Sequence, residues 1–416
     1  MLPNELVCLL KENKWKDAIE YFSRINTPLN DEMLSTLAWC NSRAGNYDLA
    51  ISQYDEMIKR QPQMAKWYYS KGYQYYILKQ WQEAIALFEN ALTLYKDFFI
   101  VKYRLAYAYL QISGNTMQWS KDSFWKAIKQ LEDCHKIYAS YPEETKCAEK
   151  STYADICALH GKTIMASERY LDKSVVLLKQ ANELKPNDND FIYQLSKAYY
   201  SKKLYDEALE ILPNIDKPYY IPELRSQILY DIGEYSKSNT ILFNLTKFRK
   251  KDYLFRRIAE NFIKLNILDK AETNAEKAIR INNRNYKNYY TMGLVYFEKK
   301  YYKSAYEYFE KSRAIKAQQY QLEYTEAVAY IEKINIITNC APEDPIEEAK
   351  AKLVKGQVVK YNADRGFGFL KCSTISEKIF FHVSDFPSQN PIIGSFVKFE
   401  IESTSKGKQA IRISFA

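Results

Sequence analysis

Amphipathic stretches follow one another along residues 1–337 with very short breaks between them, and each stretch has the apolar period of an α-helix. From residue 355 onward the pattern changes to short runs in which apolar and polar residues alternate. The runs are GQVVKYN, GFGFLKC, KIFFHVSD, GSFVKFEIES and QAIRISF, and turn-forming residues separate them. Such alternation is typical of β-strands. The pattern therefore predicts a long helical part followed by five strands, enough for a small barrel.

A small residue recurs inside the amphipathic stretches, and an apolar residue follows most of these small residues four positions later. Residues four apart lie on one helix face, so each pair marks a place where a neighbouring helix can approach closely. The intervals between successive small residues are 32, 34, 43, 47, 34, 30, 33 and 34. The small residues are Ala18, Ala50, Ala84, Ala127, Ser174, Ala208, Ser238, Ala271 and Ala305.

This spacing resembles the tetratricopeptide repeat (TPR), a 34-residue unit of two antiparallel helices. The best copy is Tyr68, Gly72, Tyr75, Trp81, Ala84, Phe88 and Ala91, and another is Tyr289, Met292, Gly293, Tyr296, Tyr302, Ala305 and Phe309. The resemblance covers about residues 1–317 and implies a TPR-like α-solenoid. The intervals of 43 and 47 predict loops near residues 112–122 and 140–150. Residues 318–337 are expected to form a helix that seals the last unit.

In a solenoid of this type the first helix of each unit lines a concave face, so the resemblance implies a groove for a protein or peptide partner. Tyrosines with interspersed cations can hold an extended peptide or stack unpaired bases, but they can equally pack between helices. The candidate groove residues are Lys66, Tyr69, Tyr73, Tyr103, Arg104, Tyr107, Tyr193, Lys197, Arg256, Arg257, Lys287 and Tyr290.

The β part resembles a cold-shock domain over its whole length, in the order and spacing of its motifs. Residues 355–370 resemble the opening of that domain with its first ribonucleoprotein-type motif, and residues 379–384 resemble the second. Residues 394–400 resemble the fourth strand, and residues 406–410 the approach to the fifth. The resemblance implies an OB-fold barrel that binds RNA or single-stranded DNA.

The residue types of these motifs suit single strands. Phe367 and Phe369 alternate with glycines, and Phe380 and His382 have the same period, so four rings can project from one sheet face. Stacked rings hold bases, and lysines or arginines nearby track phosphates. The candidate residues are Lys360, Tyr361, Arg365, Phe367, Phe369, Lys371, Phe380, His382 and Lys398.

Two observations complicate the prediction for the β part. Lys360 stands where the family usually has a tryptophan, with Tyr361 in the adjoining aromatic slot, so binding could be weaker or differently biased. The alternative for Phe367, Phe369 and Phe380 is that they form the core of an inert barrel.

No catalytic pattern accompanies these features. The sequence contains neither GxxxxGK[ST] nor HExxH, and it has only three histidines. One cluster has residue types that bind zinc, namely Cys134, His135, Cys147, Cys157 and His160, but its spacings match no standard zinc module. We therefore expect buried structural cysteines, no metal, no cofactor and no enzyme activity.

Charge and cysteine usage bear on the partners and the compartment. The net charge is +9, and residues 354–416 carry nine Lys or Arg against five Asp or Glu. That excess suits a polyanionic partner, although it also suits an ordinary solubilising surface. The seven cysteines are scattered and never form CxxC, and neither a membrane-spanning run nor a secretory signal is evident. These observations predict reduced thiols, a cytoplasmic location and no membrane partner.

The sequence thus predicts a mostly α chain with a small all-β C-terminal OB-fold barrel. The predicted domains are a solenoid with a capping helix at 1–337, a linker at 338–353 and a cold-shock-like domain at 354–416. The function we expect is that of a non-catalytic adaptor that binds a protein through the solenoid and RNA or single-stranded DNA through the barrel. Two alternatives remain: a protein-interaction subunit or sensor of a bacterial stress or defence complex, in which the barrel contacts protein, and an accessory subunit of a nuclease.

Overall fold

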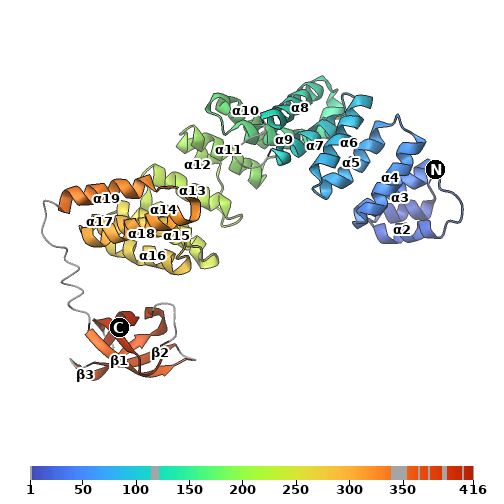
Figure 1. The fold of residues 1–416 in the computed structure, drawn as a ribbon. Helices are drawn as coiled ribbons and strands as arrows, with labels where there is room; N and C mark the ends of the chain where they lie inside the picture. Colours follow the sequence, from blue (N-terminus) through green and yellow to red (C-terminus); the bar gives the residue numbers. More distant parts are fainter. Residues whose placement is uncertain are drawn as a thin grey trace. The chain divides into compact units, whose positions relative to one another are not determined.

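The structure is a computed structural model that describes residues 2–113, 121–338, 354–363, 366–372, 375–386, 391–404 and 407–415. Within these residues it contains nineteen α-helices, all before residue 339, and five β-strands, all after residue 353 (Figure 1). The predicted fold class, mostly α with a small all-β barrel at the C-terminus, is confirmed. Apart from Thr338, the predicted linker lies outside the described residues.

The chain divides into two compact units, residues 1–228 and 229–416, and the division falls within helix α13. The helices of the first unit are α1 (Asn4–Lys11), α2 (Trp15–Ser23), α3 (Asp31–Ala44), α4 (Tyr47–Arg60), α5 (Ala65–Ile77), α6 (Trp81–Leu94), α7 (Phe99–Ile112), α8 (Lys121–Ser140), α9 (Glu143–Ile164), the 3-10 turn η1 (Glu168–Tyr170), α10 (Leu171–Leu184), α11 (Asn189–Ser201) and α12 (Tyr205–Ile211). Then come α13 (Tyr220–Asp231), α14 (Tyr235–Phe248), α15 (Asp252–Lys264), α16 (Leu268–Ile281), α17 (Tyr286–Glu298), α18 (Tyr302–Tyr320) and α19 (Thr325–Thr338).

The nine small residues found in the sequence lie on the even-numbered helices, one on each from α2 to α18, and none is more than 1% exposed. In α6, for example, Ala84 and Phe88 are both fully buried. Phe88 packs on Gly72 of α5, where an added Cβ would lie 2.9 Å from its ring. Gly293 of α17 faces Phe309 of α18 in the same way, at 2.7 Å. The small residues therefore mark the close approach of paired helices, as predicted.

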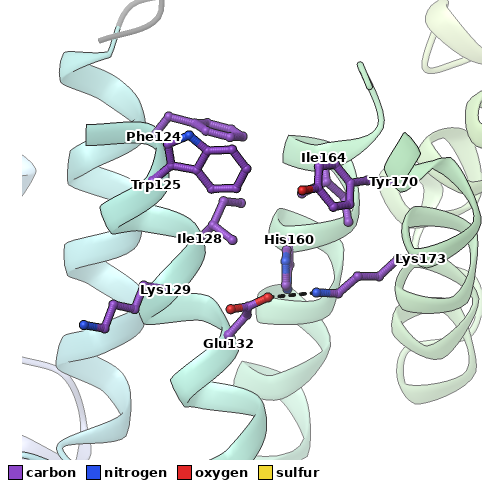
Figure 2. A pocket seen from close by; sticks show the side chains of 9 residues that line it. All are labelled: Phe124, Trp125, Ile128, Lys129, Glu132, His160, Ile164, Tyr170 and Lys173. Carbon is purple, nitrogen blue, oxygen red and sulfur yellow. Dashed lines mark hydrogen bonds and ion pairs between the residues drawn. The ribbon is translucent and has the colours of Figure 1, made fainter. Parts of the chain in front are cut away.

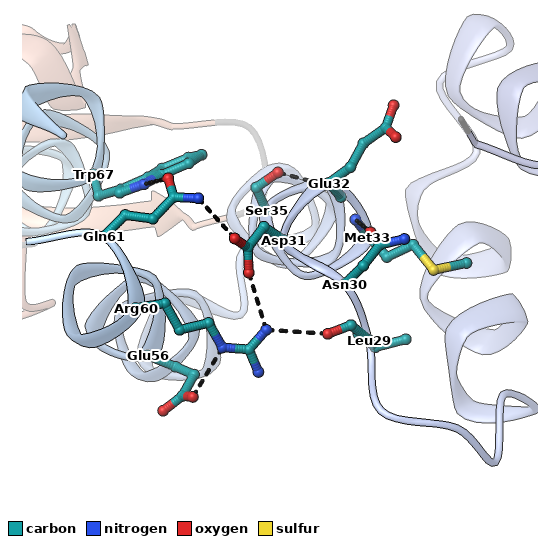
Figure 3. Close-up of polar contacts among 10 residues, drawn as sticks. All are labelled: Leu29, Asn30, Asp31, Glu32, Met33, Ser35, Glu56, Arg60, Gln61 and Trp67. Carbon is teal, nitrogen blue, oxygen red and sulfur yellow. Dashed lines mark hydrogen bonds and ion pairs between the residues drawn. The ribbon is translucent and has the colours of Figure 1, made fainter.

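Polar contacts join α3 to the two helices that follow it (Figure 3). The Asn30 side chain caps α3 by accepting from the backbone N–H three residues on, at 2.9 Å. Asp31, in the first turn, accepts from Nη1 of Arg60 at 3.1 Å and from Nε2 of Gln61 at 2.7 Å. Gln61 in turn accepts from the indole N–H of Trp67 at 3.0 Å. One side chain at the start of α3 thus connects to the end of α4 and the first turn of α5.

One prediction about the irregular units needs correction. No loop occupies residues 140–150, because only Tyr141 and Pro142 separate α8 from α9. Pro142 is the N-cap residue of α9 and has an extended backbone. Glu143 and Glu144 lie in the first turn, where their negative charges interact favourably with the positive end of the helix dipole. The extra residues therefore lengthen α8 and α9 to 20 and 22 residues. The predicted loop near 112–122 lies mostly outside the described residues.

Helix α19 packs on α18 at the end of the helical part. Ala327, Ile331 and Ile334 lie in one apolar cluster with Ala305 and Phe309. This helix begins at Thr325 rather than at residue 318, because α18 continues to Tyr320 and only then ends. Its apolar face covers core residues that the last repeat would otherwise expose.

The strands form a closed barrel in the order β1-β2-β3-β5-β4. They are β1 (Val354–Asn362), β2 (Phe367–Cys372), β3 (Ile375–His382), β4 (Phe396–Thr404) and β5 (Gly407–Phe415), with the 3-10 turn η2 (Val383–Asp385) after β3. All pairings are antiparallel except that of β3 with β5. The core contains Val358, Leu370, Cys372, Ile379, Phe381, Phe386, Val397, Phe399, Ala410 and Ile413.

Candidate nucleic-acid interface

The pairing of β2 with β3 brings four aromatic side chains together. Phe367 lies opposite His382, and Phe369 lies opposite Phe380. Paired residues on antiparallel strands project from the same face of the sheet. The Phe380 ring centroid lies 5.8 Å from that of Phe367 and 5.9 Å from that of Phe369. We call Phe367, Phe369, Phe380 and His382 the aromatic platform.

The platform faces away from the barrel core. Leu370 and Ile379 are fully buried, and they alternate with the platform residues along β2 and β3. The three phenylalanines are only partly buried, and His382 is exposed. The alternative that Phe367, Phe369 and Phe380 form the core therefore does not describe this barrel.

A glycine in β2 allows the sheet to carry these rings. A Cβ on Gly368 would lie 2.3 Å from the carbonyl oxygen of Lys360 and 2.4 Å from Cζ of Phe381. No other residue fits without moving the backbone of β1 or a buried ring. The alternation of glycine with phenylalanine thus serves close packing on the inner side and exposure on the outer side.

Two of the four predicted cations adjoin the platform. Lys360 pairs with Phe369 and is exposed, and Lys371 continues the outward series of β2. Lys398 lies on β4 opposite Lys355, so β1 separates it from the platform strands. Arg365 lies outside the described residues. The structure therefore brings Lys360 and Lys371 to the rings and places Lys398 two strands away.

Tyr361, a predicted nucleic-acid contact, lies outside the aromatic platform. Its ring stacks on Phe381, with centroids 6.2 Å apart and planes at 15°, and it packs against the barrel core. The reason is a β-bulge between Val358 and Lys360. The bulge inserts one residue, so Lys360 turns outward and Tyr361 turns inward.

Three residues of this surface were missed in the sequence. Asn362 lies opposite Phe367 on β1, and Lys355 lies opposite Lys398. Lys378 of β3 is exposed, two positions before Phe380. The period of two that selected Phe380 and His382 also selects Lys378. Asn362 becomes recognisable only when the bulge in β1 is known.

Comparison with known proteins agrees with this architecture. Residues 354–415 match the family model of the 'Cold-shock' DNA-binding domain. Residues 354–415 are a cold-shock domain. Residues 41–98 match a tetratricopeptide repeat model, so the helical part carries TPR units. Repeats of this family point to protein interaction, and a cold-shock domain points to nucleic-acid binding. No curated protein sequence matches the chain.

Several solved structures are similar to the chain at low identity. Yeast Tom70 is 12% identical over 84% of this chain and 97% of its own, with a TM-score of 0.39. MamA from Desulfovibrio magneticus RS-1 is 16% identical over 40% and 97%, with a TM-score of 0.37. YrrB, described as a TPR protein with an unusual peptide-binding site, is 14% identical over 45% and 95%, with a TM-score of 0.35.

The candidate groove residues all lie on odd-numbered helices, which are the first helices of the repeats: α5, α7, α11, α15 and α17. Lys66, Lys197 and Lys287 are exposed. The tyrosines among them, together with Arg104, Arg256 and Arg257, are partly buried. Tyr69 and Tyr290 also pack on the second helix of their repeat, 5.9 Å from Phe88 and 5.5 Å from Phe309. The tyrosines therefore contribute to packing while keeping part of their surface exposed.

Arg104 of α7 lies among three tyrosines of α5 and α7. Its guanidinium is 5.6 Å from the ring of Tyr73 and 5.2 Å from the rings of Tyr76 and Tyr103. It donates a 3.4 Å hydrogen bond to the Tyr76 hydroxyl, and among the described residues it has no carboxylate partner. Burial raises the pKa of Tyr76 and of Tyr103, so both hydroxyls remain neutral beside this cation.

Arg256 has a different environment. It is 19% exposed and forms a 2.8 Å ion pair with Glu260 of the same helix. Glu260 also accepts a hydrogen bond from Thr291 of α17. Of the two guanidinium groups, that of Arg104 is therefore the one left without an acidic partner in the described structure.

The cysteines and histidines of the cluster noted in the sequence do not converge on one point. Cys134 and Cys157 are buried, whereas Cys147 is exposed. His135 and His160 contact each other, Nε2 to Nδ1, at 3.0 Å. Within the described residues, no group of three or more His, Cys, Asp or Glu side chains has the geometry to hold a metal ion. Nor is any described helix long and apolar enough to cross a membrane.

The two histidines should make the stability depend on pH. Burial lowers the pKa of His135 to about 4 and that of His160 to about 3, and the charge of Lys173 adds to both effects. An unfolded histidine titrates near pH 6.5, so the unfolded state binds more protons below that pH. The free energy of unfolding should therefore fall by up to ~1.4 kcal/mol per pH unit for each histidine as the pH drops from 6.5 towards 4.

Urea unfolding of the wild-type chain and of a His135→Gln/His160→Gln variant, at pH 6.5 and 5.0, measures this effect. The wild type should lose more stability than the variant over that interval, in which few carboxylates titrate. Equal losses would mean that the two rings are already accessible to protons in the folded state.

Proposed function

We propose that this chain is a non-catalytic adaptor that holds single-stranded nucleic acid on its cold-shock domain and a protein partner on the first helices of its repeats. The observation that carries the nucleic-acid half is the aromatic platform with Lys360 and Lys371 beside it. Three rings within 6.4 Å of one another, on the outer face of a barrel, offer stacking surfaces to successive unpaired bases. Duplex DNA keeps its base faces covered, so the platform selects single strands.

Recognition by the platform should depend little on base sequence. Every base has a π-face, and the lysines contact the phosphates that all strands share. His382 and Asn362 both lie opposite Phe367, at one edge of the platform. They can hydrogen-bond to base edges, which gives a modest preference for particular bases at one or two positions. Affinity should therefore vary less between sequences than between single and double strands.

A titration of the full chain with labelled heptanucleotides of RNA and of DNA tests this half of the proposal. Each phosphate contact releases condensed counterions, so the logarithm of the affinity should fall linearly with the logarithm of salt concentration, by about 0.7 per contact. Two to four lysine contacts predict a slope between about −1.4 and −2.8. Equal affinity for a duplex of the same length, or no binding of either strand at low salt, would contradict the proposal.

The protein half rests on the odd-numbered helices. Arg104 is held in a tyrosine-lined site without an acidic partner in the described structure, and a cation over aromatic faces interacts favourably with them. A carboxylate from a partner can pair with this guanidinium and contact the neighbouring rings. The partner chemistry that fits best is therefore an extended acidic segment with apolar or aromatic neighbours.

Substitution of Arg104 by methionine tests the protein half. The change keeps most of the side-chain volume but removes the cation, so proteins that co-purify with the wild-type chain should be depleted at least about tenfold, since breaking a charge-assisted contact costs ~1.5–3 kcal/mol. Lys96→Met is the matched control, because Lys96 is an exposed cation just before α7. Identical co-purifying proteins for both variants, measured by quantitative mass spectrometry, would remove Arg104 from the binding surface.

The two binding halves are joined by fifteen residues, 339–353, between α19 and β1. A chain of that length spans at most ~50 Å. Covalent linkage of the two parts raises the effective concentration of a bound strand and a bound protein for each other without any new contact.

A further inference from the structure

A pocket opens between α8 and the α9–η1–α10 segment, and none of the residues assigned above to the platform or the groove lines it (Figure 2). It encloses about 220 Å³. A cavity of ~150 Å³ is enough for benzene, whereas drug-sized ligands need ~300 Å³ or more, so this pocket has room for one ring system. Its apolar wall consists of Phe124, Trp125, Ile128, Ile164 and Tyr170.

The floor of the pocket contains a buried polar atom without a partner. His160 is fully buried and lines the pocket, and its Nδ1 contacts His135. Its other ring nitrogen, Nε2, has no hydrogen-bond partner among the described residues. A buried polar group left unpaired destabilises the folded chain, and a hydrogen bond to a ligand in the pocket would remove that penalty.

His160 is also the end of a hydrogen-bonded series. The Tyr153 hydroxyl lies 3.0 Å from Nδ1 of His135, and Nε2 of His135 lies 3.0 Å from Nδ1 of His160. If the tyrosine donates, His160 presents an N–H at Nε2; if it accepts, His160 presents a lone pair there. The neutral pair can therefore match either a donor or an acceptor on a ligand without gaining charge.

Charged groups stand at the rim beside this ring. Lys173 of α10 and Glu132 of α8 form a 2.9 Å ion pair, and both side chains are about half exposed. Figure 2 shows the pair next to His160, whereas the ammonium group of Lys129 points away from the other lining residues. The rim thus offers a donor and an acceptor side by side. Trp125, half exposed, faces Tyr170 edge-on, with centroids 6.5 Å apart.

We propose that this pocket binds the base of a nucleotide, with the ring against Trp125 and Tyr170 and the base edge on His160 and the Lys173–Glu132 pair. A nucleobase is planar, has about the size of the pocket, and carries adjacent donors and acceptors on one edge. An aliphatic ligand would leave His160 unpaired, and a charged group on the floor would have to be desolvated. The base can belong to a free mononucleotide or to an unpaired residue of a strand.

Histidine NMR of the full chain tests the proposal, because the protein has only three histidines. Two of them, His135 and His160, belong to the hydrogen-bonded series that ends at the pocket floor, and His382 belongs to the platform. The probes are AMP, GMP, CMP and UMP, each added to chain labelled with ¹⁵N-histidine, and then a pentanucleotide of each of the four bases. At least one of these probes should shift the ring signals of His160 and His135, since a ligand fixes their tautomers. If the mononucleotides fail and a pentanucleotide shifts them, the base comes from a strand.

Two variants and a control complete the test. Trp125→Ala should lower the affinity for the bound probe at least tenfold. Trp39→Ala, which removes another exposed tryptophan on α3, should change that affinity less than twofold. Lys173→Met should also lower the affinity for the probe, and the chain should stay folded because the lysine side chain is half exposed. No shift of His160 with any probe, or equal affinity of the Trp125 and Trp39 variants, would overturn the proposal. A shift of His382 alone would overturn it and leave the barrel function intact.

Discussion

Replacing Phe380 by alanine should weaken the binding of a single-stranded heptanucleotide to the full chain by about 5- to 150-fold, which is the effect of losing ~1–3 kcal/mol of base stacking. Phe380 is the central ring of the platform, because it contacts both Phe367 and Phe369. Its removal takes away one stacking surface and the support of the two others. Fluorescence anisotropy at fixed salt measures the change.

The matched control is Phe396→Ala in the same domain. Phe396 is 65% exposed and starts β4, and none of the ring contacts within the described platform involves it. Its loss should alter affinity less than twofold. If the two variants bind equally well, exposed phenylalanines contribute only general hydrophobicity, and the platform is not the binding surface.

The second large effect is expected at Gly368. An alanine there would put its Cβ 2.3 Å from a backbone oxygen of β1 and 2.4 Å from the buried Phe381 ring, and neither can move cheaply. Overpacking of this kind costs ~1–3 kcal/mol or more, and a barrel of about sixty residues has only a few kcal/mol of stability. The barrel of Gly368→Ala should be largely unfolded and should bind no strand, although the helical part keeps its circular dichroism.

Limited proteolysis and amide exchange of residues 354–416 report this unfolding. Ser414→Ala, a substitution at an exposed position on β5, should leave the barrel protected from proteolysis and amide exchange. A protected barrel in Gly368→Ala would show that β1 can shift away from β2, and the close approach would then not explain the glycine.

The sequence predicted best what depends on local periodicity. The nine small residues are buried on nine successive second helices, and the apolar residues four positions after most of them are buried as well, because helix pairs can approach only where one side chain is short. The alternation of Phe367, Gly368 and Phe369 likewise predicted which side of β2 faces outward. Both patterns repeat within a few residues, so one sequence suffices to read them.

Features that depend on one inserted residue or on distant partners were not predictable. The bulge after Val358 reverses the direction of Tyr361, and no residue type in KGQVVKYN announces it. The contact of His135 with His160 joins residues 25 positions apart on two unusually long helices, whose length the repeat spacing had assigned to a loop. That no described carboxylate pairs with Arg104 depends on what surrounds it in three dimensions.

The central claim is that the face of β2 and β3 holds the strand, and ultraviolet cross-linking of the full chain to a 4-thiouridine heptanucleotide tests it most directly. Stacked bases react with the residues they touch, so mass spectrometry of the cross-linked peptides identifies the surface. The account predicts cross-links on Phe367, Phe369, Phe380 or His382, which disappear when unlabelled single strand competes. Cross-links confined to the helices, or to β4 and β5 with the platform unmodified, would contradict it.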